Sequence, residues 1–221
     1  MNILATGETS RIEELKLKIS SDHILTVKPR NEISGDKLAD FDIIFDLNFD
    51  DNPDWKLYSA FKGKALFLNS VKIQLAAFPV HPYTVVIGLN ALPTFLNRPL
   101  AEVSLQDKEK QKQLAAVMKE LNWNYRLVED RAGMVTPRLV FMIVNEAFYT
   151  VQEGTATKED IDMGMKLGTN YPMGPFEWCK KAGIKNVYET LDAVYLDTRD
   201  ERYKICPLLK TEYLKAISAN G

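Results

Sequence analysis

The first side chains that could do chemistry lie in a turn after the first apolar run of the chain. The turn reads Thr6-Gly7-Glu8-Thr9-Ser10, and it stands where a dinucleotide site places glycine-rich backbone amides against a pyrophosphate. Gly7 is the one glycine kept of the usual three, and Glu8 would bring a carboxylate close to the expected phosphates. Gly7 is therefore the candidate cofactor-binding residue of a weakened dinucleotide site.

The other dinucleotide-binding features are also altered. An acid normally follows the second strand and holds the ribose hydroxyls, but Lys28 lies at that position. Glycines before residue 133 stand only at positions 7, 35, 63 and 88, so this half contains no second phosphate-binding loop. Three interpretations stay open: a structural remnant of a nucleotide-binding sheet, a site that accepts NAD in an altered pose, or a site in which Lys28 and Arg30 bind the extra phosphate of NADP.

Zinc chemistry is not expected from this chain. Its cysteines and histidines are Cys179, Cys206, His23 and His81, which match no usual spacing of a zinc site. The N-terminal residues lack the basic start and long apolar stretch of a signal peptide. We therefore expect a cytoplasmic protein with free thiols and no metal site.

The composition favours a folded protein and argues against some partners. Of the 221 residues 46% are apolar, and 28 basic side chains stand against 30 acidic ones, which gives a net charge of -2. No basic excess is available to neutralise a run of phosphates, so nucleic acid is not an expected partner. The longest uncharged run, 73–97, is interrupted by three prolines, so no membrane span is expected.

The elements that must position these side chains alternate along the first half of the chain. Apolar, β-rich runs lie at 3–5, 24–27, 41–47, 65–68 and 84–89, separated by amphipathic or polar segments. Continuous apolar strands of this kind are typical of a parallel sheet that is covered on both faces. Residues 1–130 are therefore predicted to form a reduced, doubly wound, Rossmann-like α/β domain, completed by a helix over 107–121 and a strand from Tyr125.

From Gly133 onward the pattern becomes helical. Pro137 suits a first helical turn, residues 138–152 are apolar on nearly every side, and Gly154 follows as a stop signal. Thr157 is a suitable N-cap for the next helix. Residues 131–221 are predicted to form an all-α domain, so the expected fold class is α/β plus all-α.

This second half strongly resembles the C-terminal domain of the NAD-dependent 3-hydroxyacyl-CoA dehydrogenases. The resemblance lies in the order and spacing of several motifs: Val144-Asn145-Glu146-Ala147, Glu159-Asp160-Ile161-Asp162, Met165-Lys166-Leu167-Gly168, Tyr171-Pro172-Met173-Gly174-Pro175-Phe176-Glu177 and Cys206-Pro207-Leu208-Leu209. It implies a Rossmann-like domain joined to a helical domain through which the family commonly dimerises. It also implies NAD as the cofactor.

A weaker resemblance upstream places the family's catalytic pair. The family's histidine and glutamate are twelve residues apart, and Asn90 and Glu102 reproduce that interval with asparagine in place of histidine. In the family, the histidine takes the proton of the 3-hydroxyl group as hydride leaves for NAD, and the glutamate orients its ring. A carboxamide has no usable proton affinity near neutral pH, so Asn90 can position a substrate but cannot act as the base.

The resemblance also indicates the substrate contacts. The family's polar turn after the fourth strand appears here as Leu68-Asn69-Ser70-Val71, so Asn69 and Ser70 are the candidate substrate-binding residues. The family's active-site asparagine is replaced by Pro137. Between Val27 and Phe41 the chain has room only for a short loop, where the family has a helical arm that helps to hold coenzyme A.

Two functions remain open. The first is a dimeric, 3-hydroxyacyl-CoA dehydrogenase-like protein of fatty-acid and acyl-CoA metabolism, a pseudoenzyme candidate that has lost efficient NAD-dependent chemistry. The second is an active NAD-dependent oxidoreductase on 3-hydroxyacyl-CoA or a related hydroxy acid, in which Glu102 or a water replaces the histidine. An acyl-CoA-type small molecule and a second copy of the chain are the expected partners.

Overall fold

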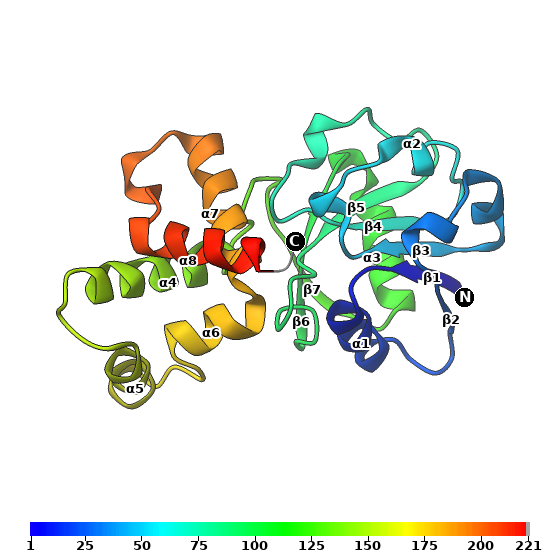
Figure 1. Ribbon diagram of the computed structural model, residues 1–221. Helices are drawn as coiled ribbons and strands as arrows, with labels where there is room; N and C mark the ends of the chain where they lie inside the picture. The colour runs from blue at the N-terminus through cyan, green and yellow to red at the C-terminus, as the bar shows by residue number, and fades with distance from the viewer. Residues whose placement is uncertain (220–221) are drawn as a thin grey trace. The chain divides into compact units, whose positions relative to one another are not determined.

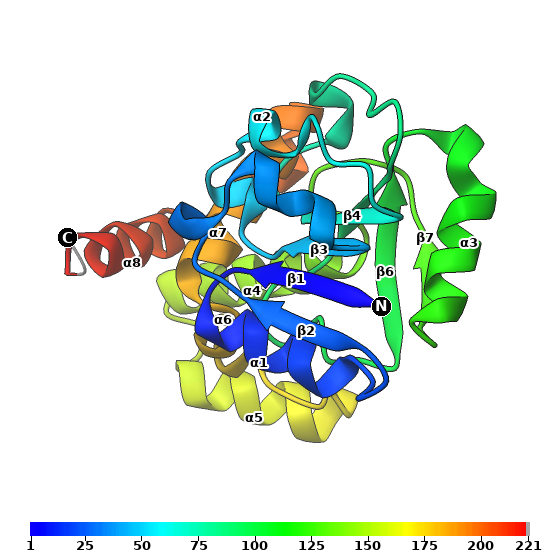
Figure 2. The ribbon, with the colours of Figure 1, turned by 90° about the vertical axis from the view of Figure 1, so that its right-hand side faces the viewer.

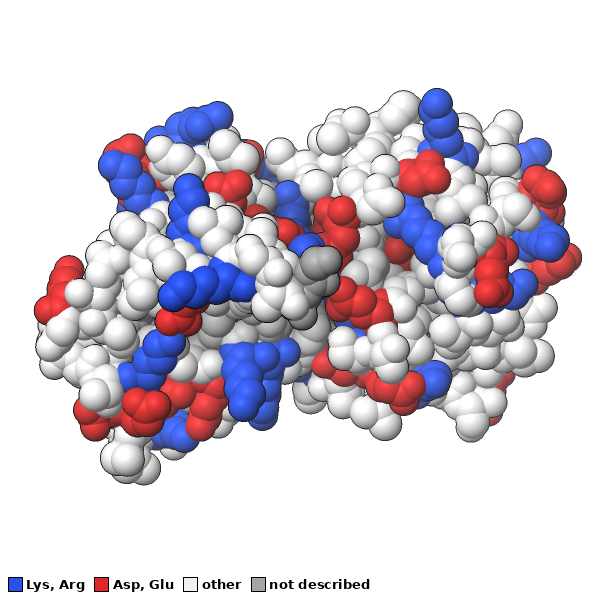
Figure 3. All heavy atoms as spheres, viewed as in Figure 1, with Lys and Arg blue, Asp and Glu red and all other residues white. Residues whose placement is uncertain are grey.

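The computed structural model describes residues 1–219, which form two compact units. The first unit covers Met1–Met134 and the second begins at Val135, slightly beyond the boundary at 130 expected from the sequence. Within the described residues, no helix is long and apolar enough to cross a membrane. On the face shown in Figure 3, basic and acidic side chains are interspersed on each unit.

The first unit is built on a seven-stranded sheet (Figure 1). Its strands are β1 (Asn2–Thr6), β2 (Ile24–Val27), β3 (Ile43–Asp46), β4 (Ala65–Asn69), β5 (Val85–Leu89), β6 (Leu100–Leu105) and β7 (Asn124–Leu127). Their spatial order is β2-β1-β3-β4-β5-β6-β7, with β2 and β1 side by side at one edge (Figure 2). The predicted Rossmann-like α/β domain is therefore confirmed.

The sheet differs from the expected parallel one at a single strand pair. Strands β1 to β5 run parallel, but β6 runs antiparallel to β5 and parallel to β7. The segment from Asn90 to Pro99 contains no helix that could carry the chain back across the sheet, so β6 returns in the opposite direction. As a result, the start of β6 lies next to the carboxyl end of β5.

The two faces of this sheet are covered differently. Helices α1 (Thr9–Lys18) and α3 (Gln111–Glu120) pack on one face, where Ile12, Leu15 and Leu114 join the apolar core. The other face is covered by the short helix α2 (Trp55–Tyr58) and by 3₁₀ turns at Arg30–Glu32, Gly35–Asp40, Phe49–Asp51 and Leu75–Ala77. The segments between β2, β3, β4 and β5 are thus occupied by short turns instead of full crossover helices.

The segment after β7 belongs to the sheet unit because its polar groups are bound there. The Asp130 carboxylate accepts hydrogen bonds from the backbone amides of Leu75 (3.0 Å) and Ala76 (2.8 Å). The backbone carbonyl of Asp130 accepts a hydrogen bond from Gln74 Nε2 (2.8 Å). Gly133 N donates to Val71 O at 2.6 Å. These bonds explain why the contact boundary follows Met134.

The second unit is all-α, as expected. Its helices are α4 (Thr136–Gln152), α5 (Lys158–Thr169), α6 (Pro175–Ala182), α7 (Ile184–Thr198) and α8 (Pro207–Ser218). Pro137 lies in the first turn of α4, Gly154 follows its end with a φ of 72°, and Thr157 Oγ1 caps α5 by accepting from Asp160 N. The predicted start and stop signals are thus confirmed.

One polar residue of α4 has a structural role in this unit. Asn145 donates from Nδ2 to Lys204 O and accepts at Oδ1 from Cys206 N, both at 2.8 Å. Both ends of a buried carboxamide are therefore satisfied by the segment that leads into α8, which ties α4 to that segment.

Candidate functional site

The turn after β1 is closed by the segment that follows β3. Gly7 has a φ of 151°, and a Cβ atom there would lie 2.8 Å from Leu47 Cβ and 3.0 Å from Asn48 Oδ1. The backbone amide of Glu8 donates to Asn48 Oδ1 at 2.8 Å. In the dinucleotide fold, this close approach and this amide serve the pyrophosphate. Here Leu47 fills the space beside Gly7, and Asn48 accepts the hydrogen bond of the Glu8 amide. The residues present therefore do not fit a pyrophosphate bound in that way.

Asn48 is itself held by a charged network around Asp51. Asn48 Nδ2 donates to Asp51 Oδ2 at 2.8 Å, and Lys72 Nζ lies 2.5 Å from Asp51 Oδ1. The buried guanidinium of Arg11, on α1, lies 3.5 Å from Asp51 Oδ2 and 3.7 Å from the Glu8 carboxylate. The network joins α1 to the segments after β3 and β4, so Asn48 is fixed in place by three parts of the chain.

The end of β2 is occupied in a similar manner. Arg30 Nη1 lies 3.0 Å from Asp46 Oδ2, and the Tyr58 hydroxyl donates to the same oxygen at 2.8 Å. Burial raises the pKa of Asp46, and the nearby Arg30 opposes this effect. Lys28 lies over the ring of Phe41, 6.0 Å from its centroid. Arg30, which follows β2, is thus engaged with Asp46 at the end of β3.

Asn69, at the end of β4, is fully buried and uses both ends of its side chain inside the unit. Its Nδ2 donates to Asp50 Oδ1 at 2.6 Å, and its Oδ1 accepts from Ala91 N at 2.9 Å. Asp50 Oδ2 accepts from the backbone of Val71 and Lys72. Burial raises the pKa of Asp50, and the charge of Lys72 opposes it. Asn69 therefore links three strand ends to one another.

The structure brings Asn90 and Glu102 together, as their spacing in the sequence suggested. Asn90 Nδ2 donates to Glu102 Oε2 at 3.2 Å, and Asn90 N donates to Glu102 O at 3.1 Å. Asn90 is 3% exposed, and its Oδ1 has no hydrogen-bond partner within residues 1–219. Ser70 lies on the neighbouring strand end, where its backbone N donates to Leu89 O at 3.3 Å. Gly7, Ser70 and Asn90 therefore all follow carboxyl ends of parallel strands, the edge at which open α/β sheets bind ligands.

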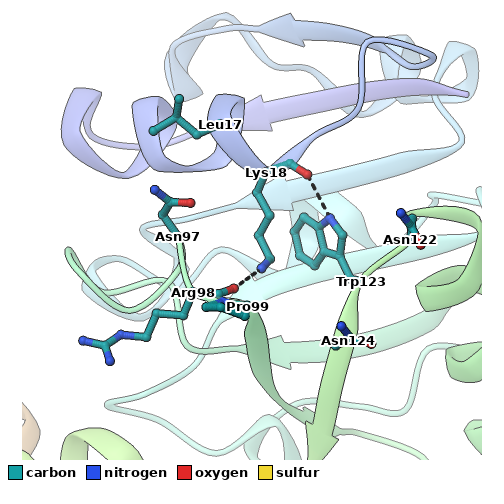
Figure 4. A pocket seen from close by; sticks show the side chains of 8 residues that line it. All are labelled: Leu17, Lys18, Asn97, Arg98, Pro99, Asn122, Trp123 and Asn124. Atoms are coloured by element: carbon teal, nitrogen blue, oxygen red, sulfur yellow. Dashed lines mark hydrogen bonds between the residues drawn. The ribbon is translucent and has the colours of Figure 1, made fainter.

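A separate cavity of 430 Å³ lies between the end of α1 and the starts of β6 and β7 (Figure 4). Lys18 Nζ reaches across it to Arg98 O, and Trp123 Nε1 donates to Lys18 O at 3.2 Å. Lys18 also lies 5.0 Å from the centre of the Trp123 ring, and burial lowers the pKa of this lysine. These contacts connect α1 to the start of β6.

The histidines and cysteines do not gather into a further site. His81 is buried before β5, with Nε2 bonded to Tyr58 O and Nδ1 accepting from Thr84 N, both at 3.1 Å. Cys179 and Cys206 are both free and buried. In the part of the chain that the structure describes, no three His, Cys, Asp or Glu side chains are grouped so that they could hold a metal ion.

The residues that follow β3 and close the turn after β1 were not among the predicted site residues. Asn48, Asp50 and Asp51 form a polar cluster directly after β3. Their signal was available, because polar side chains at the carboxyl end of a buried parallel strand lie at the ligand-binding edge of such a sheet. The cluster matches no dinucleotide-binding motif, so its sequence pattern alone does not indicate a role at the turn after β1.

The chain is thus a two-unit protein in which an open α/β sheet, with a polar pair after β5, is followed by a five-helix unit. Residues 133–216 match the family model of the 3-hydroxyacyl-CoA dehydrogenase, C-terminal domain. The helical unit of this chain is therefore similar to the C-terminal domain of that family, as its motifs indicated.

Two bacterial relatives are similar over the same region. The chain is 39% identical over 87 residues to the 3-hydroxyadipyl-CoA dehydrogenase of Escherichia coli, a match that covers 39% of this chain and 18% of the relative. It is 39% identical over 89 residues to a probable 3-hydroxybutyryl-CoA dehydrogenase of Bacillus subtilis, covering 40% and 31% of the two chains. These matches thus span less than a third of each relative.

Solved structures match over nearly the whole chain. M. tuberculosis FadB2 has a TM-score of 0.73 at 17% identity and covers 99% of this chain and 93% of its own. The (S)-3-hydroxybutyryl-CoA dehydrogenase PaaH1 from Ralstonia eutropha has a TM-score of 0.70 at 18% identity and covers 97% and 94%. At this level of identity the likeness shows the fold.

Proposed function

We propose that this chain is a 3-hydroxyacyl-CoA dehydrogenase-like protein of fatty-acid metabolism that binds an acyl-CoA thioester and does not carry out efficient NAD-dependent oxidation. The observation that carries the proposal is the bond from Glu8 N to Asn48 Oδ1, together with the contact of Leu47 on Gly7. A pyrophosphate in this turn would have to displace a side chain that Asp51 also holds. It would also lie beside the Glu8 carboxylate.

The missing base supports the same proposal. Asn90 stands where the family's histidine is expected, and it is hydrogen-bonded to Glu102. A carboxamide cannot accept a proton near neutral pH, and removal of a general base typically costs roughly 10²–10⁴ in rate. Even a bound cofactor would therefore leave the chemical step slow.

One observation favours an active oxidoreductase as the second candidate. The Asn90–Glu102 pair persists at the carboxyl edge of the sheet, with the Glu102 carboxylate partly accessible. A carboxylate at this position could act as a base directly or through a water molecule. This alternative still requires NAD to bind in a pose different from that of the dinucleotide fold.

Titration calorimetry with NADH tests the proposal directly. We expect no binding of NADH up to millimolar concentration, binding of an acyl-CoA thioester, and no loss of NADH absorbance when NADH and acetoacetyl-CoA are both present. Micromolar NADH binding with steady consumption of NADH would instead support the oxidoreductase. The variant Asn48→Gly is informative, since it releases the Glu8 amide: a gain of NADH binding in this variant alone would identify Asn48 as the residue that blocks the site.

The proposed partners and location rest on separate features. The names of the relatives all refer to a hydroxyacyl-CoA, which supports an acyl-CoA-type ligand. A homodimer through the helical unit is supported by α5, whose twelve residues are all described and none of which is buried. Two free, buried cysteines suit a reducing compartment such as the cytoplasm.

A further inference from the structure

The cavity between the end of α1 and the starts of β6 and β7 contains the partly buried ammonium group of Lys18 (Figure 4). Lys18 Nζ donates to Arg98 O and lies 5.0 Å from the centre of the Trp123 ring. No carboxylate among residues 1–219 forms an ion pair with Lys18, and burial is the cause that lowers its pKa. Removing an ammonium group from water without an opposite charge costs free energy, and a bound anion would offset this cost.

The lining of the cavity offers hydrogen-bond donors and no carboxylate. The lining residues are Leu17, Lys18, Asn97, Arg98, Pro99, Asn122, Trp123 and Asn124. The three asparagines are exposed, and their carboxamides form no hydrogen bond with another group of residues 1–219. A carboxamide nitrogen can donate two hydrogen bonds. The lining can therefore surround an anion at Lys18 with neutral donors.

Two negative groups at this end of α1 are already satisfied by donors of the protein. The carbonyl of Lys18 lies at the negative end of the helix dipole, and it accepts from Trp123 Nε1 at 3.2 Å. The carboxylate of Glu14, one turn earlier, accepts from the backbone amides of Thr94 at 2.6 Å and Asn97 at 3.1 Å. Both groups thus have partners that reduce their repulsion of an anion.

A second hollow, of 440 Å³, adjoins the cavity along the starts of β6 and β7. It shares Pro99, Trp123 and Asn124 with the cavity and is also lined by Leu100, Tyr125 and Arg126. The guanidinium of Arg98 points away from Lys18 (Figure 4), so Arg98 and Arg126 add positive charge beside the ammonium group. Neither lining contains an acidic residue. Hollows lined by one sign of charge concentrate ligands of the opposite sign.

We propose that the cavity at Lys18 is a binding site for a phosphate group, with Lys18 as the charged donor and the lining asparagines as neutral donors. Phosphate oxygens accept hydrogen bonds, and an ammonium group binds them as a compact point charge. The phosphate group can belong to inorganic phosphate or to a phosphate monoester whose organic part lies against Leu100 and Tyr125. The site shares no residue with the Asn90–Glu102 pair, so the proposal does not rest on the proposed function.

Titration calorimetry of the full chain measures the affinity for inorganic phosphate, at constant ionic strength and in a buffer that contains no other oxyanion. We expect one phosphate per chain with a dissociation constant of about 1 mM or lower. Phenyl phosphate distinguishes the two sources of the group. Tighter binding of phenyl phosphate would indicate a monoester as the ligand, and equal binding would indicate free phosphate.

Variants of α1 and of the turn after α3 locate the site. Lys18→Met removes the charge, keeps the apolar stem and should weaken phosphate binding by about tenfold or more. Lys16→Met is the matched control, because Lys16 is exposed on the same helix and pairs with Glu13 at 2.8 Å. Asn122→Gly removes a carboxamide where φ is 56°, a conformation that glycine keeps without strain. It should weaken binding by about two- to tenfold.

Reductive methylation of the wild-type chain tests the same site without a substitution. Phosphate at roughly ten times its dissociation constant should slow the methylation of Lys18 by about tenfold, by mass action, and leave that of Lys16 unchanged. Mass spectrometry of proteolytic peptides measures both rates. Absence of phosphate binding to the wild type, equal binding by wild type and Lys18→Met, or methylation of Lys18 that phosphate does not slow would each overturn the proposal.

Discussion

At the scale of single residues, the protonation of His81 is coupled to folding. The ring is 1% exposed, and its Nδ1 accepts from Thr84 N, so the folded state holds the neutral form. Burial lowers the pKa of His81; the bond to Tyr58 O opposes this effect, and the charge of Lys110 adds to it. The unfolded chain therefore binds a proton near the ordinary value of about 6.5, at a pH where the folded chain does not.

The sign of the pH dependence follows from this difference. Between the lowered folded pKa and about 6.5, the unfolded state carries more protons, so the free energy of unfolding falls with decreasing pH by up to about 1.4 kcal/mol per unit. Urea unfolding of the wild type and of His81→Gln, from about pH 7.5 to about pH 5.5, measures this change in the free energy of unfolding. The free energy of unfolding of the variant should depend less steeply on pH. The raised pKa values of Asp46 and Asp50 act with the opposite sign, but they are common to both proteins. Parallel curves would show that His81 does not titrate as described.

Some functional residues could be read from the sequence and others could not. The family resemblance implied that Asn90 and Glu102 lie together, and Asn90 Nδ2 donates to Glu102 Oε2. The closure of the turn at Gly7 depends on Asn48, which is forty residues from Glu8. No local pattern encodes such a contact, since it requires the order in which β1 and β3 lie in the sheet.

At the scale of elements, the Asp130 carboxylate fixes the segment that leaves β7. It accepts from Leu75 N and Ala76 N at the start of a 3₁₀ turn. We expect Asp130→Ala to lower the free energy of unfolding by about 1.5–3 kcal/mol, the range for bonds to a charged acceptor, and Asp130→Asn to lower it less.

Urea unfolding measures this effect, and the adjacent Glu129 supplies the matched control. The exposed carboxylate of Glu129 pairs with the exposed Lys108 at 2.7 Å. Glu129→Ala should change stability by less than about 1 kcal/mol, as exposed ion pairs do. Equal losses in the two alanine variants would mean that the Asp130 bonds contribute nothing beyond surface charge.

The elements themselves were largely predictable, but their directions were not. Continuous apolar runs gave the parallel strands, and Pro137, Gly154 and Thr157 marked helix ends correctly. The reversal at β6 was missed because an apolar strand has the same pattern in either direction. The direction of β6 is set by its contacts with β5 and β7, and those contacts depend on the whole sheet.

At the scale of the whole molecule, the exposed apolar side of α5 bears on self-association. Leu167 is 82% exposed and Met163, one turn earlier, is 57% exposed. If this side forms the proposed dimer interface, Leu167→Glu should weaken the dimer by tenfold or more, since it buries a charge among apolar groups.

Sedimentation equilibrium across a range of protein concentrations measures the association. Leu17→Glu is the matched control, because Leu17 is 75% exposed on α1 in the other unit. We expect this control to associate like the wild type. A wild type that stays monomeric, or a Leu167→Glu variant that dimerises normally, would contradict the interface.

The two buried cysteines allow the local unfolding of the helical unit to be measured. Cys179 and Cys206 are the two cysteines of the chain, and both lie inside the helical unit. Burial raises the pKa of Cys179 to about 12, and alkylating reagents attack the thiolate. Modification of either sulfur must therefore wait for the helices around it to part. The rate of thiol labelling therefore measures the local unfolding of the helical unit alone, because the sheet unit contains no cysteine.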